Sequence, residues 1–221
     1  MVKQLAIVLS VALLCGTSYG ANILTNPSFE DGMNGWSSYI GTYSLGGSNG
    51  SFQSVTAMGG VSPSNGTYMA RLIGNPGDNP ISPTASIWQV VNFTGTAGSP
   101  ITVAIDAAKS SSEGGSGGQN LSLQVWGLDA GYTLQADGLP LTGGTQLINF
   151  ASSNSNVAMP VPYTANATPA ASYSAYMVRY VRTNGGRVLY LDNAALDVVP
   201  EPATMGLLAV GGLMALRRRN R

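Results

Sequence analysis

Hydrophobic and polar positions alternate in several stretches through the middle of the chain. Alternation with a period of two over such lengths is typical of β-strands that bury one face. Segments rich in Gly, Pro and Asn separate these stretches and favour turns. No part of the middle region has a convincing helical period. The pattern therefore predicts strands over residues 87–93, 101–107, 121–128, 173–181 and 188–198.

Many short strands punctuated by turns indicate an all-β sandwich of the jelly-roll type. The segment 110–120, "SSSEGGSGGQN", has almost nothing to bury, and we expect it to form a loop between two strands. The two ends of the chain have a different pattern from the middle. We expect a signal peptide over 1–20, one β-sandwich domain over 21–198, and a sorting tail over 199–221.

The N-terminus has the three parts of a secretory signal peptide. Lys3 supplies a positive charge, residues 5–14 form an apolar run, and residues 18–20 supply the cleavage region for signal peptidase. We expect cleavage after Gly20. A lipoprotein signal ending at Cys15, the sole cysteine, is an alternative that the bulky preceding Leu14 disfavours. Cleavage after Gly20 leaves a mature chain that has no disulfide.

Charge and composition exclude several function classes. Only 9% of residues are charged, against about 25% in typical soluble proteins. Between positions 21 and 202, five basic residues face ten acidic ones, a formal charge of −5 that disfavours nucleic-acid binding. The chain has no histidine and no GxxxxGK[ST] loop, which removes the usual nucleophilic and phosphate-binding machinery. We predict a non-catalytic protein; the alternative enzyme is a carboxylate-based glycoside hydrolase.

Four sequence segments resemble, in order, the galactose-binding-like jelly-roll fold of carbohydrate-binding modules. They are "NILTNPSFEDGMNGWSSY" (22–39), "NGTYMARLIG" (65–74), "SIWQVVNFT" (86–94) and "LYLDNAALDVV" (189–199). Together they span nearly the whole middle region. The resemblance implies the fold more strongly than it implies sugar binding.

The same resemblance implies a structural calcium ion that joins the first and last strands. The matching positions are Glu30 and Asp192, and carboxylate oxygens are ligands that Ca²⁺ prefers. The alternative is that Glu30 caps a turn and Asp192 hydrogen-bonds to backbone at a strand end. Trp36 belongs to the Gly-Trp pair of the resemblance, and we expect it in the core.

Three side chains are candidates for contact with a sugar. In "LSLQVWGL", Trp126 and Gln124 lie on the face opposite the aliphatic residues, and an aromatic ring beside an amide suits sugar binding. The alternative is that both faces of this strand are covered. Trp88 is a third candidate, with Gln89 on the opposite face of its strand; the jelly-roll resemblance implies a structural role for Gln89. Tyr176 and Tyr180 share a face with Arg182, and that face is a further candidate platform; the alternative is that at least one of the two tyrosines packs in the core.

The C-terminal tail resembles the PEP-CTERM sorting signal of Gram-negative bacteria that make exopolysaccharide. A short motif comes first, then an apolar run over 203–216, then basic residues. The resemblance implies an exosortase that cuts at the motif; the alternative is a permanently retained anchor. The motif residues are Val199, Pro200, Glu201 and Pro202, and the basic stop is Arg217, Arg218 and Arg219.

The tail also has a physical rationale. An apolar helix over 203–216 is about 21 Å long, less than the ~30 Å core of a bilayer, and suits a temporary anchor. We expect inner-membrane tethering before processing, then a place in the envelope, on the surface or outside the cell. The expected role is a surface or matrix protein that contacts exopolysaccharide. The alternative is a purely structural surface or biofilm protein.

Overall fold

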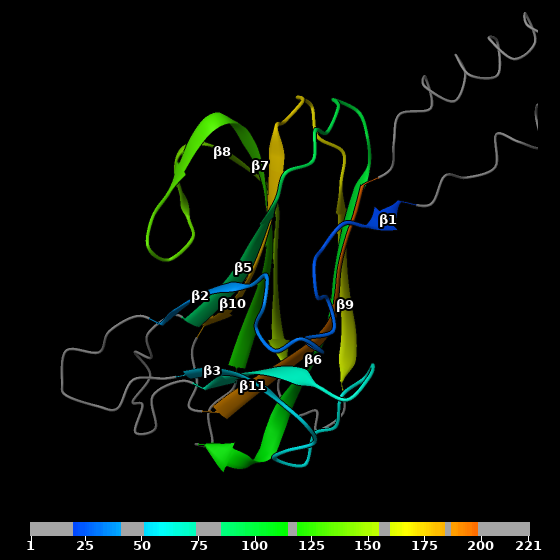
Figure 1. Ribbon diagram of the computed structural model, residues 1–221, viewed down its shortest axis with the longest axis vertical. Helices are drawn as coiled ribbons and strands as arrows, with labels where there is room; N and C mark the ends of the chain where they lie inside the picture. Colours follow the sequence, from blue (N-terminus) through cyan, green and yellow to red (C-terminus); the bar gives the residue numbers. More distant parts are fainter. Residues whose placement is uncertain are drawn as a thin grey trace, which may run out of the picture.

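The computed structural model describes residues 20–40, 51–73, 85–114, 119–154, 160–183 and 187–198. Two antiparallel sheets form two layers (Figure 1). In the first, sheet A, the strand order is β3 (Ser51–Val55), β4 (Met69–Ile73), β11 (Arg187–Val198), β6 (Ile101–Gly114) and β9 (Val161–Ala167), and β1 (Ala21–Asn22) also pairs with β11. In the second, sheet B, the order is β2 (Ser37–Ile40), β5 (Ala85–Val91), β10 (Ala175–Thr183), β7 (Gln119–Leu134) and β8 (Pro140–Asn154).

The predicted all-β sandwich is confirmed, and the five predicted strands correspond to β5, β6, β7, β10 and β11. The alternation did not reveal β8 and β9, nor the short strands β1 to β4. The prediction of a loop over 110–120 is wrong at both ends, because β6 extends to Gly114 and β7 begins at Gln119. Pairing with a neighbouring strand stabilises these polar residues in the extended conformation.

The main core lies between the two sheets and uses one face of each strand. Ile101, Val103 and Ile105 of β6 are fully buried in it, as are Leu123 and Val125 of β7. The prediction that Trp36 lies in the core is confirmed. Its side chain is 8% exposed, and its indole Nε1 donates to the backbone oxygen of Asn26 at 3.0 Å.

The two ends of the sandwich domain lie side by side in sheet A. Ala21 pairs with Val198 and Asn22 with Asp197. The side chain of Asn22 reinforces this pairing, because its Oδ1 accepts from the N–H groups of Leu24 and Leu196. The expected signal peptide and the sorting tail therefore adjoin the same edge of the domain.

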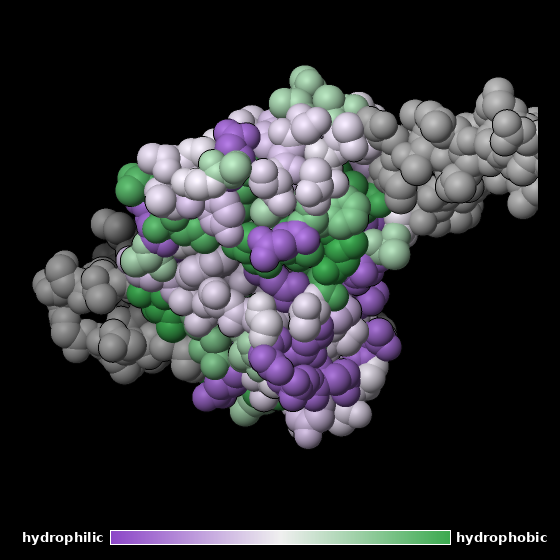
Figure 2. All heavy atoms as spheres, turned by 45° about the horizontal axis from the view of Figure 1, so that its top comes forward, coloured by the Kyte–Doolittle hydropathy of each residue, from purple (hydrophilic) through white to green (hydrophobic). Residues whose placement is uncertain are grey.

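The surface has few charges, as the composition predicts. On the face shown in Figure 2, residues of near-neutral hydropathy cover much of the surface, with hydrophobic and hydrophilic patches between them. The expected signal helix and the short C-terminal helix lie outside the described residues. Within the described ranges, no helix is long and apolar enough to cross a membrane.

Candidate functional site on the outer face of sheet B

The outer face of sheet B, the face turned away from the main core, holds the predicted sugar-binding side chains. The predicted division of β7 is confirmed. Leu123 and Val125 point into the core, while Trp126 packs against a separate cluster on the outer face. Trp126 and Gln124 are each half-buried. The two side chains are therefore close to one another on this face but are not fully open to solvent.

A hairpin made by the ends of β7 and β8 bends over this outer face (Figure 1). Its turn, residues 135–139, is closed by hydrogen bonds from Gln135 N to Leu139 O at 2.8 Å and from Gly138 N to Gln135 O at 3.0 Å. Gly138 has φ of 83°, a conformation that favours glycine. Asp137 Oδ1 accepts from Leu139 N at 3.0 Å, a local contact that stabilises the turn.

This turn covers Trp88. A Cβ added at Gly138 would lie 2.5 Å from Cδ2 of Trp88, so the turn backbone rests directly on the indole ring. Trp88 is 8% exposed and forms an apolar cluster with Leu128, Ala175 and Met177. A ligand reaches Trp88 only when the turn moves away, so this arrangement does not support Trp88 as part of an open sugar platform.

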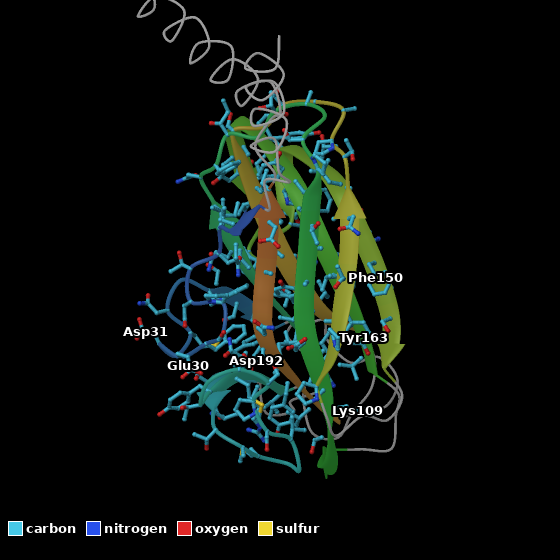
Figure 3. All side chains as sticks on the ribbon, turned by 90° about the vertical axis from the view of Figure 1, so that its right-hand side faces the viewer. Glu30, Asp31, Lys109, Phe150, Tyr163 and Asp192 are labelled. Atoms are coloured by element: carbon cyan, nitrogen blue, oxygen red, sulfur yellow. The ribbon has the colours of Figure 1, made fainter. Side chains whose placement is uncertain are left out.

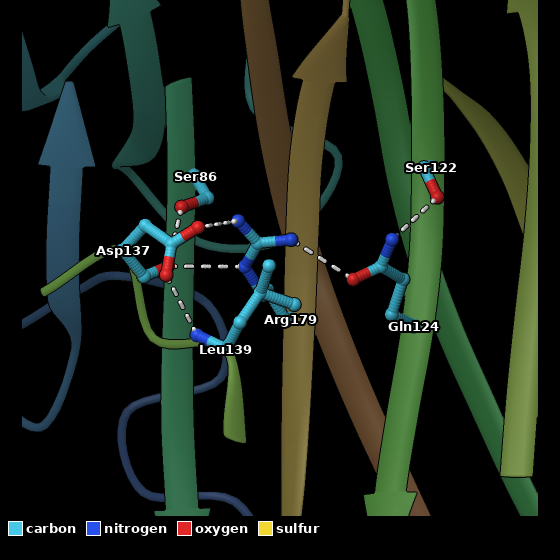
Figure 4. Close-up of polar contacts among 6 residues, drawn as sticks. All are labelled: Ser86, Ser122, Gln124, Asp137, Leu139 and Arg179. Carbon is cyan, nitrogen blue, oxygen red and sulfur yellow. Dashed lines mark hydrogen bonds and ion pairs between the residues drawn. The ribbon is translucent and has the colours of Figure 1, made fainter. Parts of the chain in front are cut away.

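Asp137 fastens the turn to the sheet through a polar network (Figure 4). Its backbone oxygen accepts from Arg179 Nε and from Ser86 Oγ, both at 3.2 Å. Its carboxylate Oδ2 lies 3.6 Å from Arg179 Nη2, and Arg179 Nη1 donates to Gln124 Oε1 at 2.9 Å. Burial lowers the pKa of Arg179 from its usual value, and the nearby Asp137 charge opposes this effect. A buried guanidinium thus has an anion and an amide as partners.

Polar side chains continue the outer face toward β8. Gln124 Nε2 donates to Ser122 Oγ at 3.3 Å, and Ser122 Oγ donates to Asn149 Oδ1 at 3.1 Å. Asn149 and Gln146 of β8 are exposed. Among the described residues, the buried indole Nε1 of Trp126 has no hydrogen-bond partner. This edge of the face offers one aromatic ring with several amides, the functional groups that a sugar requires.

The predicted platform of Tyr176, Tyr180 and Arg182 is wrong. These residues alternate with those of the outer face, and both tyrosines are fully buried in the main core. Tyr180 Oη donates to the backbone oxygen of Ala104 in the opposite sheet at 3.0 Å. Burial raises the pKa of Tyr180, which keeps the phenol neutral.

Glu30 and Asp192, labelled in Figure 3, both accept hydrogen bonds from the loop 64–68. Glu30 Oε1 accepts from the N–H groups of Thr67 and Tyr68, each at 2.8 Å. Asp192 Oδ2 accepts from Ser64 N at 2.7 Å and from Asn65 N at 2.9 Å. These contacts match the alternative role, in which the carboxylates cap backbone rather than bind metal.

The arrangement does not fit a calcium ion. The carboxylates face N–H donors, whereas Ca²⁺ takes six to eight oxygen ligands. Within the described part of the chain, no three or more His, Cys, Asp or Glu side chains gather into a metal-binding group. Burial raises the pKa of Asp192, and the hydrogen bonds from the 64–65 loop and from Asn193 N counteract part of this effect. Calcium at Glu30 and Asp192 stays a prediction without support from the geometry.

Sequence reasoning missed Asp137 and Arg179, the two residues that close the outer face. A signal for the turn was present, because Asp137-Gly138 is a typical hairpin dipeptide between two extended runs. The direction in which the hairpin bends, and hence what it covers, had no such signal. Long-range packing against Trp88 determines it.

Comparison with known protein families identifies the tail. The PEP-CTERM protein-sorting motif matches residues 198–221, which confirms the resemblance of the tail to this signal. No curated protein matches the chain. The matched residues lie outside the part that the structure describes, apart from Val198 at the end of β11.

Comparison with solved structures concerns the sandwich domain. TmCBM61 in complex with beta-1,4-galactotriose has a TM-score of 0.51 at 16% identity, over 80% of this chain and 99% of that one. The xylan-binding CBM22-1 domain of Paenibacillus barcinonensis Xyn10C has a TM-score of 0.50 at 12% identity, over 84% and 99%. The enzymatically active domain of tailspike protein 4 of bacteriophage CBA120 scores 0.51 at 10% identity, but this chain spans only 21% of it. The chain thus joins a PEP-CTERM sorting motif to a domain with the jelly-roll fold of carbohydrate-binding modules.

Proposed function

We propose that this protein is an exported, non-catalytic surface protein that an exosortase sorts through its tail and that contacts polysaccharide through its jelly-roll domain. The contact site is the open edge of the outer face of sheet B, with Trp126 as the stacking ring. Gln124, Gln146 and Asn149 supply hydrogen bonds to sugar hydroxyls.

One observation supports this site above others. Trp126 stands half-buried beside a row of amide and hydroxyl side chains, on a face that the main core does not use. The sorting motif supports export to the cell surface, where the protein would meet polysaccharide. The solved structures of a galactotriose complex and of a xylan-binding domain share the fold, which supports a carbohydrate as the ligand class.

The test is binding of the purified domain to a glycan array and then to soluble oligosaccharides, followed by intrinsic fluorescence. We expect Trp126→Ala to weaken binding about 30-fold, since loss of a central stacking residue costs about 2 kcal/mol. Gln146→Ala, which removes an exposed side chain, checks the site without disturbing packing. Tyr68→Ala removes an exposed aromatic residue elsewhere and serves as the control.

Two outcomes would contradict the proposal. A blank array with the correctly folded domain would favour the alternative, a purely structural surface protein. Binding that survives Trp126→Ala and Gln146→Ala would move the site elsewhere on the domain. Mass spectrometry of the protein from its native host tests the sorting step, and a mature C-terminus at residues 199–202 is the expected result.

A further inference from the structure

We propose that the turn 135–139 occupies a second sugar subsite, formed by Trp88, Arg179 and Gln124, and that this subsite binds an acidic sugar when the turn moves away. The inference rests on the proposed function, because it extends the same face of sheet B from Trp126 toward β5. It assigns a ligand class that the open edge of the face does not determine.

The turn makes the contacts that a bound sugar would make. The flat backbone at Gly138 lies on the indole ring of Trp88, where a sugar ring would stack. The backbone oxygen of Asp137 accepts from Ser86 Oγ and Arg179 Nε, as a sugar hydroxyl would. An aromatic surface surrounded by convergent donors is typical of a ligand subsite.

The chemistry of Arg179 determines the ligand class. Its side chain is 4% exposed and lies 3.6 Å from the Asp137 carboxylate. When the turn leaves, the guanidinium loses this anion and keeps only the neutral Gln124 as its side-chain partner among these contacts. A carboxylate restores the charge-assisted contact, whereas a neutral sugar does not. A uronic acid combines a ring for Trp88 with a carboxylate for Arg179.

The hairpin is suited to movement because its attachment to the sheet is irregular. The pairing of β7 with β8 shifts register between Leu128 and Thr133 and again between Thr133 and Leu134. Irregular pairing interrupts the ladder of hydrogen bonds and bends the strands. Leu141 is 66% exposed, so this part of the hairpin packs against the domain on one side only.

The first test measures opening of the turn without any ligand. In a Trp126→Phe background the remaining tryptophans are Trp36 and Trp88, each 8% exposed, so acrylamide should quench fluorescence weakly. Asp137→Asn keeps the shape of the turn but removes its negative charge. Because the buried Arg179 guanidinium then loses its ion pair with the turn, the open population should rise roughly tenfold. Melting curves confirm that each variant is folded.

The second test measures ligand class with a matched pair of probes. Oligogalacturonate and its methyl ester share ring and linkage but differ in charge. We expect Asp137→Asn to bind oligogalacturonate roughly tenfold more tightly than the unsubstituted protein does, and more tightly than it binds the ester. The double substitution Asp137→Asn and Arg179→Gln should remove the preference for the acid over the ester. The formal charge of −5 on residues 21–202 opposes nonspecific adsorption of acidic chains.

The outcomes separate this inference from the proposed function. Unchanged quenching and unchanged oligogalacturonate binding in Asp137→Asn would overturn the inference, even if Trp126 still binds neutral glycan. An ester that Asp137→Asn binds as tightly as the acid would overturn the acidic ligand class. A third outcome is that Asp137→Asn binds oligogalacturonate, that this binding requires Arg179, and that substitution of Trp126 does not affect it. This outcome would support the inference and contradict the proposed Trp126 site.

Discussion

Replacing Asp192 with alanine tests whether this carboxylate holds the 64–68 loop or a metal ion. Asp192 lies on β11 and is 2% exposed. It accepts three backbone N–H bonds, from Ser64 at 2.7 Å, Asn65 at 2.9 Å and Asn193 at 2.7 Å. Alanine removes both acceptor oxygens and hence all three bonds, two of which attach the loop to β11.

The magnitude follows from these contacts. A net value of about 1 kcal/mol for each bond gives a total of about 3 kcal/mol. Ser64 and Asn65 are exposed, so water replaces part of the lost interaction. We therefore expect the free energy of unfolding to fall by about 2–3 kcal/mol. For a domain of this size, that corresponds to a fall of about 5–10 °C in melting temperature.

Urea unfolding followed by circular dichroism measures the change. Asp129→Ala removes an exposed carboxylate on β7 and is the control, with an expected change within about 0.5 kcal/mol. Each protein is also melted in EDTA and in about 1 mM CaCl₂, the affinity range of extracellular calcium modules. We expect no shift with calcium. A calcium-dependent rise of several degrees that Asp192→Ala abolishes would refute the interpretation of Asp192 as a backbone anchor.

Two further predictions concern buried polar groups. Gln89→Leu should lower the free energy of unfolding by about 2–4 kcal/mol, because Gln89 makes three hydrogen bonds to the backbone of Thr25 and Gly35. Urea unfolding measures this change, and Gln53→Ala, at an exposed position, is the control. The pKa of Asp192 is raised in the folded state. The native protein therefore binds more protons than the unfolded one just above pH ~4. As a result, acidification from neutral pH should stabilise the natural protein relative to Asp192→Asn. Bound calcium would lower that pKa, and a relative loss of stability on acidification would therefore contradict the prediction.

The sequence predicts strands in which the main core takes every second residue, even where, as in β10, the other face is buried as well. β10 and β7 alternate clearly because the core fixes every second residue. β8 escapes prediction because, from Leu141 to Ser152, Ile148 alone is buried. An edge strand that is exposed on most positions needs no hydrophobic period, and neighbouring strands supply its hydrogen bonds.

The sequence predicts which face of the sheet holds the candidate site, but it does not predict whether that face is accessible to a ligand. Alternation places Trp126 and Gln124 together and opposite Leu123, and the structure confirms this arrangement. Whether the face is open depends on a turn that lies many residues away from Trp88 in the sequence. The contact of Gly138 with Trp88 arises only when β7 and β8 have paired and bent.

The motif residues of the jelly-roll resemblance act mainly as links between distant parts of the chain. Asn22 bonds to backbone 172 and 174 residues away, Gln89 to backbone 64 residues away, and Asp192 to backbone 127 and 128 residues away. Each link joins a loop or an end of the domain to a strand, a task for which many small secreted domains use disulfides. This explains why the resemblance identifies the fold and leaves the ligand open. The residues on which the proposed ligand depends, Trp126, Asp137 and Arg179, lie outside the matched segments.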